Sequence, residues 1–164
     1  MSKKQNQIYN FILIVIGALM ILPLFVAFLN AVAQYGSVSA TETIGLFESG
    51  MQDTLDAMDK SGAYIFYVIT QIATVVGVAA AVAIAVFAVL KLCKVKANLA
   101  AIENILALIA MIAGVVILVS EIIFFIASTS SGSGFKTFFS GAWGWYFAFI
   151  GAFASGFLSK LAAK

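Results

Sequence analysis

The chain has 164 residues, of which 63% are hydrophobic and only 10% are charged. Since about a quarter of the residues in a soluble domain are usually charged, this composition excludes a soluble globular enzyme and indicates a membrane protein. Arginine and histidine are absent, Cys93 is the single cysteine, and the net charge is +2, which excludes an intrachain disulfide and a nucleic-acid-binding protein. Because no catalytic or phosphate-binding motif is present, we predict no enzyme activity, no cofactor and no metal site.

Four long apolar segments are each long enough to cross a membrane as a helix, and they lie at about residues 8–33, 63–90, 102–127 and 138–158. A hydrocarbon core of about 30 Å requires roughly 20 helical residues. No linker is long enough to separate two domains. The sequence therefore predicts an all-α fold with one domain over residues 1–164, namely a four-helix transmembrane bundle with a short external amphipathic helix.

The first apolar segment also has features of a signal peptide, because Lys3 and Lys4 precede it and the Ala-Val-Ala run at 31–33 resembles a cleavage site. However, it is longer than the apolar region of a signal peptide, which spans about 7–15 residues. We interpret it as a retained helix. Pro23 removes one backbone hydrogen bond, so we predict a kink near residues 19–23.

Seven of the nine lysines lie at the two ends of the chain and in the connection after the second apolar segment. Only Lys60 and Lys136 lie in the other two connections. Because lysine favours the cytoplasmic side of a membrane, we predict a multi-pass protein in the lipid bilayer with both termini in the cytoplasm. Segment 34–62 and the Ser/Gly-rich connection 128–136, predicted as a short flexible loop, are then external.

The external segment 34–62 contains an apolar stripe at helical spacing, which consists of Ile44, Phe47, Met51, Leu55 and Met58. This spacing predicts an amphipathic helix. The segment is acidic, with five Asp or Glu residues against Lys60. Two interpretations remain open: the stripe packs on the outer end of the bundle as a cap, or it forms a surface for a partner or for self-association.

Small residues recur at helical spacing in the last three apolar segments, and such residues let helices approach closely in lipid. The predicted helix-packing residues are Ala73, Gly77, Ala81, Ala107, Gly114, Gly144, Ala148, Ala152 and Gly156. Packing within one bundle would explain them without a partner. However, three such helices exceed what a minimal bundle requires, and the last segment also has a separate aromatic stripe from Phe139 to Phe157. We therefore predict a homo-oligomer or association with other membrane-protein subunits.

Polar residues inside the bilayer are costly and often functional. Glu121 lies within the third apolar segment, and Asn30 and Gln71 are predicted at a similar depth, so the three residues could form a polar cluster. Glu121 is then either an interhelical hydrogen-bonding group or a cation or proton site. Glu103 lies at the inner edge of the same segment, where we expect Lys94 and Lys96 to neutralise its charge.

Two functions follow. The first is a structural role, in which the protein associates with itself or is a subunit of a larger membrane complex. The second is a small channel or carrier subunit with Glu121 in a cation or proton path. A conduit needs polar groups along its length, whereas residues 105–119 are all apolar, which favours the structural role. The topology is similar to that of claudin-type four-helix membrane proteins, but no external cysteine pair is present, so the similarity implies nothing further.

Overall fold

The computed structural model describes residues 3–95, 100–132 and 134–162. Its elements are, in chain order, α1 (Lys3–Leu19), the 3-10 helix η1 (Leu22–Leu24), β1 (Ala27–Tyr35), β2 (Val38–Gly45), α2 (Met51–Ala57), the 3-10 helix η2 (Ser61–Ala63), α3 (Tyr64–Leu92), α4 (Ala100–Ser128), β3 (Ser130–Gly132), β4 (Phe135–Gly141) and α5 (Trp143–Ala162). The described residues include four helical segments that are long and apolar enough to span a membrane, which comprise Lys4–Leu24, Ser61–Leu92, Ala100–Ser128 and Trp143–Ala162.

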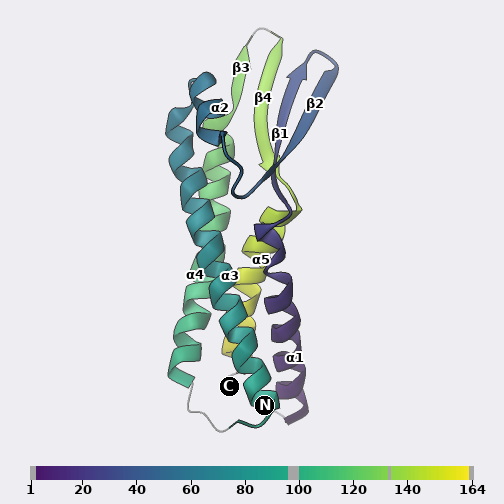
Figure 1. Ribbon diagram of the computed structural model, residues 1–164, viewed down its shortest axis with the longest axis vertical. Coiled ribbons are helices and arrows are strands. Elements are labelled where there is room, and N and C mark those ends of the chain that lie inside the picture. The colour runs from purple at the N-terminus through teal and green to yellow at the C-terminus, as the bar shows by residue number, and fades with distance from the viewer. Residues whose placement is uncertain (1–2, 96–99, 133, 163–164) are drawn as a thin grey trace.

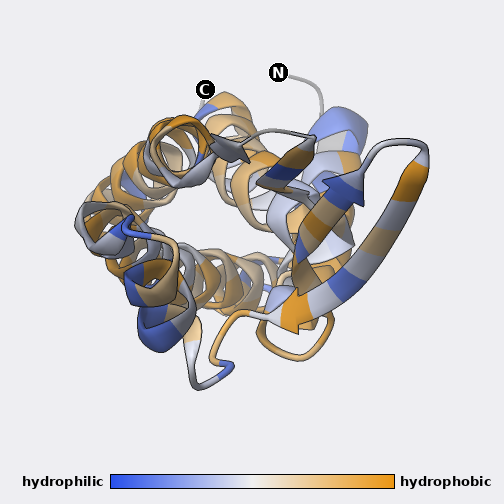
Figure 2. Cartoon of the chain, turned by 90° about the horizontal axis from the view of Figure 1, so that it is seen from above, coloured by the Kyte–Doolittle hydropathy of each residue, from blue (hydrophilic) through white to orange (hydrophobic). Residues whose placement is uncertain are grey.

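The four long helices form a bundle along the long axis of the molecule (Figure 1). The four strands and α2 lie together at one end of this bundle, which we call the sheet end. α1 begins and α5 ends at the opposite end, which we call the terminal end. Seen from the sheet end, the helices are largely hydrophobic, whereas hydrophilic residues gather in α2 and alternate with hydrophobic ones along β2 (Figure 2).

The strands form one antiparallel sheet in the order β2-β1-β4-β3. β1 pairs with β2 on one side and with β4 on the other, so that Ala31 lies opposite both Glu42 and Phe139. The tight connection from β1 to β2 contains Gly36 at φ +55°, a left-handed conformation that glycine adopts without the steric cost of a Cβ atom. β2 is left at one edge of the sheet.

This sheet means that the predicted all-α fold is only partly right. The helix predicted at 8–33 ends at Leu19, and its second half forms η1 and β1. Pro23, in η1, cannot donate a backbone hydrogen bond and would clash with the preceding helical turn. From Ala27 onward the backbone pairs with β2 and β4 instead. A short apolar run is compatible with either a helix or a buried strand, which is why hydrophobicity alone did not separate the two.

Three further boundaries differ from the prediction. The last helix begins at Trp143 because the preceding residues form β4, and the connection predicted as a flexible loop contributes to the β3–β4 hairpin. The external helix is limited to the seven residues of α2. Gly50, which precedes α2, has φ +95° and therefore ends any helix on its N-terminal side. The upstream part of the predicted amphipathic helix instead forms β2.

The largest hydrophobic cluster lies where the sheet meets the bundle, and aromatic rings from three elements form its centre. The ring of Phe124 in α4 lies 5.8 Å from that of Tyr67 in α3 and 5.1 Å from that of Phe139 in β4. All three side chains are buried. Because β4 is bonded to the rest of the sheet, these rings fix the sheet to the top of α3 and α4.

Candidate functional site

The nine predicted helix-packing residues are all buried inside the single chain. A Cβ atom on Gly77 would lie 3.1 Å from the Cβ of Ala152, and one on Gly114 would lie 2.9 Å from the carbonyl oxygen of Phe149. These glycines are therefore required for the close approach of α3 and α4 to α5. The small residues pack one bundle together, so they do not form a surface for a second subunit.

The aromatic stripe of the last segment lies mainly on the outer side of α5. Trp143, Tyr146, Phe153 and Phe157 are exposed, and the rings of Phe153 and Phe157 are stacked with centroids 6.3 Å apart. Phe139 does not belong to this stripe, since it lies in β4 and is buried in the core. The exposed aromatic face of α5 is available to lipid or to another membrane protein.

Glu121 is completely buried between the helices near the sheet end. Among the described residues, neither of its carboxyl oxygens has a hydrogen-bond partner. The hydroxyl of the adjacent Ser120 lies 2.7 Å from the hydroxyl of Thr70 in α3, and each hydroxyl also lies within hydrogen-bond distance of a carbonyl oxygen of its own helix. Because each hydroxyl has one proton, at most two of these three hydrogen bonds are donated at once. These two hydroxyl groups thus have partners other than Glu121, and both carboxyl oxygens of Glu121 are buried without a hydrogen-bond partner in the described structure.

The predicted polar cluster of Asn30, Gln71 and Glu121 is not joined by hydrogen bonds within the part of the chain that the structure describes. Asn30 lies in β1 and its amide donates to the carbonyl oxygen of Gly141 at 3.4 Å. The amide of Gln71 donates to the carbonyl oxygen of Leu46 at 2.7 Å. Gln71 therefore holds the connection after β2 instead of contacting the carboxyl group.

Tyr67 is a second residue that holds this connection, and it was not among the predicted site residues. Its hydroxyl lies 2.8 Å from the carbonyl oxygen of Leu46 and 3.2 Å from that of Gly45, and it donates to these acceptors. The signal in the sequence is its position one helical turn before Gln71, which places both side chains on one face of α3. Together they attach the end of β2 to the bundle.

A second polar cluster lies at the terminal end. The ammonium group of Lys91 in α3 contacts both carboxyl oxygens of Glu103 in α4, at 2.6 and 2.5 Å, and the hydroxyl of Ser159 in α5 donates to the same carboxylate at 3.2 Å. Glu103 is buried, and its carboxylate is bonded to one residue of α3 and one of α5, so it connects these helices to α4. Lys91, and not Lys94, neutralises Glu103, while Lys96 lies outside the described residues.

The five residues of the predicted external stripe are divided between elements. Met51 and Leu55 of α2 are buried in the hydrophobic cluster, and Ile44 at the end of β2 and Met58 after α2 are half-buried against it. Only Phe47 is exposed, at 57% of its surface. Most of the stripe therefore packs on the sheet end of the bundle.

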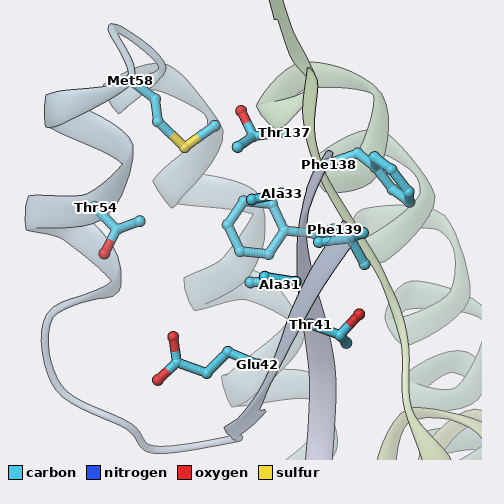
Figure 3. Close-up of a pocket in the computed structure, with 11 residues that line it drawn as sticks. Ala31, Ala33, Thr41, Glu42, Thr54, Met58, Thr137, Phe138 and Phe139 are labelled. Atoms are coloured by element: carbon cyan, nitrogen blue, oxygen red, sulfur yellow. The ribbon is translucent and has the colours of Figure 1, made fainter. Parts of the chain in front are cut away.

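The sheet end contains a pocket of about 220 Å³ between α2 and the sheet face that points towards it (Figure 3). Ala31, Ala33 and Ala40 line one side, and Thr54 and Met58 line the other. Glu42, Thr137 and Phe139 also line the pocket, so the alanines form only part of its sheet side. We call this pocket the alanine groove.

An acidic pocket of about 180 Å³ adjoins the alanine groove, and the two share Glu42 and Thr54 among their lining residues. Glu48 also lines the acidic pocket, and its carboxylate accepts a hydrogen bond of 2.9 Å from the backbone N–H of Gly45. No lysine lines either pocket in the described part of the chain. The two pockets together therefore offer an apolar recess beside two carboxylates.

The described residues contain no group of three or more His, Cys, Asp or Glu side chains that could hold a metal ion. The fold and these sites define a class, which is a helical membrane protein of four long apolar helices with a four-stranded sheet at one end. No protein-family model matches the chain, and no curated protein matches it.

Proposed function

We propose that this chain is a small integral membrane protein with a structural role, and that it acts as an assembly subunit within a larger membrane complex or with further copies of itself. The bundle would anchor the sheet end at the membrane surface. The observation that carries the proposal is the division of surfaces: the small residues face inward, while the edge of β2, the alanine groove and the aromatic face of α5 stay exposed.

The lysine distribution supports a location of the sheet end outside the cytoplasm. Lys91, Lys94 and Lys160 lie at the terminal end of the bundle, whereas Lys60 and Lys136 lie at the sheet end with five carboxylates. Positive charge near membrane helices favours the cytoplasmic side. We therefore propose cytoplasmic termini and an external sheet.

The mass of the particle extracted in a mild detergent tests the structural role. We expect a particle heavier than one 17.3 kDa chain with its detergent, either as a multiple of this chain or with a stoichiometric second protein. Mass spectrometry of the intact particle distinguishes these two forms. A homogeneous single chain, obtained across several mild detergents and from native membranes, would contradict the proposal.

A second candidate function is a channel or carrier subunit, and one specific observation favours it. Glu121 is buried with both oxygens unpartnered in the described structure, and such intramembrane carboxyl groups often bind protons or cations. Against it, residues 105–119 of α4, which lie between Glu103 and Glu121 in the sequence, are all apolar. Ion flux in vesicles that contain the purified protein tests this candidate directly.

A further inference from the structure

We propose that the sheet end binds an extended, basic segment of a partner protein. The segment would pair with the free edge of β2 as an additional strand and would place one apolar side chain in the alanine groove. This inference rests on the proposed assembly role, because it names the chemistry of the partner and the surface that receives it.

The first observation is the free edge of β2. β2 is the terminal strand of the sheet, and its residues from Val38 to Thr43 are exposed. Edge strands are commonly protected from further pairing by lysine, proline or bulges in the strand. β2 contains neither lysine nor proline, its single charged side chain is Glu42, and it includes β-branched residues that favour a strand. Its outer backbone groups are therefore suited to pair with another extended segment.

The second observation is the position of the alanine groove beside this edge. Ala40 of β2 lies opposite Ala33 of β1, so the two small side chains lie on the same face of the sheet. Alternate residues of an added strand would point to that face. The volume of about 220 Å³ is small compared with usual ligand pockets of about 300–1000 Å³. It suits a single apolar side chain, such as leucine, better than a drug-sized ligand.

The third observation is the charge next to the groove. Glu42 and Glu48 both line the acidic pocket. A lysine or arginine two residues from the apolar side chain would share its face of the added strand and would approach these carboxylates. A second copy of this sheet end would instead bring like charges together. Charge complementarity therefore favours a basic partner over a second copy.

Binding of a short labelled peptide to the full-length protein in nanodiscs of zwitterionic phosphatidylcholine tests the proposal. The probe has leucine at its centre, lysine two residues to either side, and threonine or valine elsewhere. One matched peptide replaces lysine with glutamate, and another replaces two central residues with proline to prevent strand pairing. We expect fluorescence anisotropy to detect binding of the lysine peptide alone, and no binding to empty nanodiscs.

Two variants of the protein locate the bound peptide, each with a matched control. Glu42→Gln combined with Glu48→Gln should weaken binding about three- to tenfold, because each substitution removes one weak, solvent-screened charge pair with the peptide. The control for the charge is Asp56→Asn, which lines neither pocket. Ala40→Leu should fill the groove and weaken binding at least about tenfold, since the apolar side chain of the peptide loses its site. The control for the added volume is Ser39→Leu on the other face of β2.

The proposal is overturned if the lysine peptide does not bind, if the glutamate or proline peptide binds as well, or if either variant behaves like its control. Thermal unfolding of each variant verifies that it is folded, which we expect because all of the substituted residues are exposed. Failure of the peptide together with a heavier native particle would refute this inference and leave the assembly role in place. A single-chain native particle would refute the assembly role itself.

Discussion

Glu103 and Glu121 lie near opposite ends of α4 and both are buried, yet only Glu103 has a charged partner in the described structure. Lys91 and Ser159 satisfy Glu103 from two neighbouring helices. At the sheet end, Gln71 donates to Leu46, and both carboxyl oxygens of Glu121 are without a hydrogen-bond partner among the described residues. The carboxylate of Glu103 therefore joins three helices, whereas burial of the unpartnered carboxyl group of Glu121 lowers the stability of the fold.

Removal of the Glu121 carboxyl group should stabilise the protein. A buried polar group without a partner costs about 1–3 kcal/mol, so Glu121→Leu is expected to raise the free energy of unfolding by about 1 kcal/mol. Glu121→Gln keeps the size of the side chain and removes its ionisable proton. Unfolding in detergent measures both, and a less stable Leu variant would show that the carboxyl group has a stabilising partner. If the protein conducts ions, loss of flux in the Gln variant would favour the channel or carrier function.

The Lys91–Glu103 pair should contribute to stability at the terminal end. Lys91→Met leaves the buried carboxylate with Ser159 alone, and removal of one partner from a fully buried pair costs about 3–5 kcal/mol. Because the side chain of Lys91 is 38% exposed, we expect a smaller loss of about 1–2 kcal/mol. Lys94 is exposed and lies two residues beyond the end of α3, so Lys94→Met is the control and should have no effect on stability. Equal unfolding temperatures for the two variants would mean that the ion pair contributes nothing measurable.

Gly114→Ala should separate α4 from α5. The added Cβ would lie 2.8 Å from the backbone nitrogen of Phe153 and 2.9 Å from the carbonyl oxygen of Phe149, neither of which can move alone. Overpacking of this kind typically costs about 1–3 kcal/mol. Gly62→Ala is a matched control, because a Cβ atom there meets nothing within 4 Å. Thermal unfolding compares the two variants. If Gly62→Ala lowered the stability and Gly114→Ala did not, this result would contradict the packing described for the bundle.

The native Cys93 tests the proposed orientation without a new cysteine. It is exposed at the terminal end, and it is the only cysteine in the chain. In intact cells it should not react with a membrane-impermeant thiol reagent until the cells are permeabilised. A cysteine introduced at Ser49 or Ser131 at the sheet end should react at once. Labelling of Cys93 before permeabilisation would reverse the orientation.

Hydrophobicity predicted four long apolar helices, because a long apolar run has few other stable solutions, but the bounds of the first and last helices differ from the prediction. It could not locate β1, whose residues 27–33 continue the apolar run of α1. The partners of β1 include Phe139, far away in the sequence, and no local pattern reports such pairing. Pro23 was the local sign of a break, although it was interpreted as a kink in a continuous helix.

The candidate sites were predictable to different degrees. Its position inside an apolar run singled out Glu121 from the sequence, and the structure buries this side chain without a hydrogen-bond partner among the described residues. The engagement of Gln71 with Leu46 depends on where β2 ends, so it required the tertiary structure. The alanine groove also could not be predicted, because it forms only when Ala31, Ala33 and Ala40 come together on one face of a sheet that the sequence did not indicate.

Photo-crosslinking in native membranes tests most directly whether the sheet end contacts a partner. A photoreactive residue at Thr41 on β2 is compared with one at Ile105, which is 60% exposed on α4 and lies away from the sheet. We expect a discrete protein adduct of defined mass from Thr41 and none from Ile105. Equal adducts from both positions, or no adduct from Thr41 in membranes that contain the native complex, would contradict an assembly role for the sheet end.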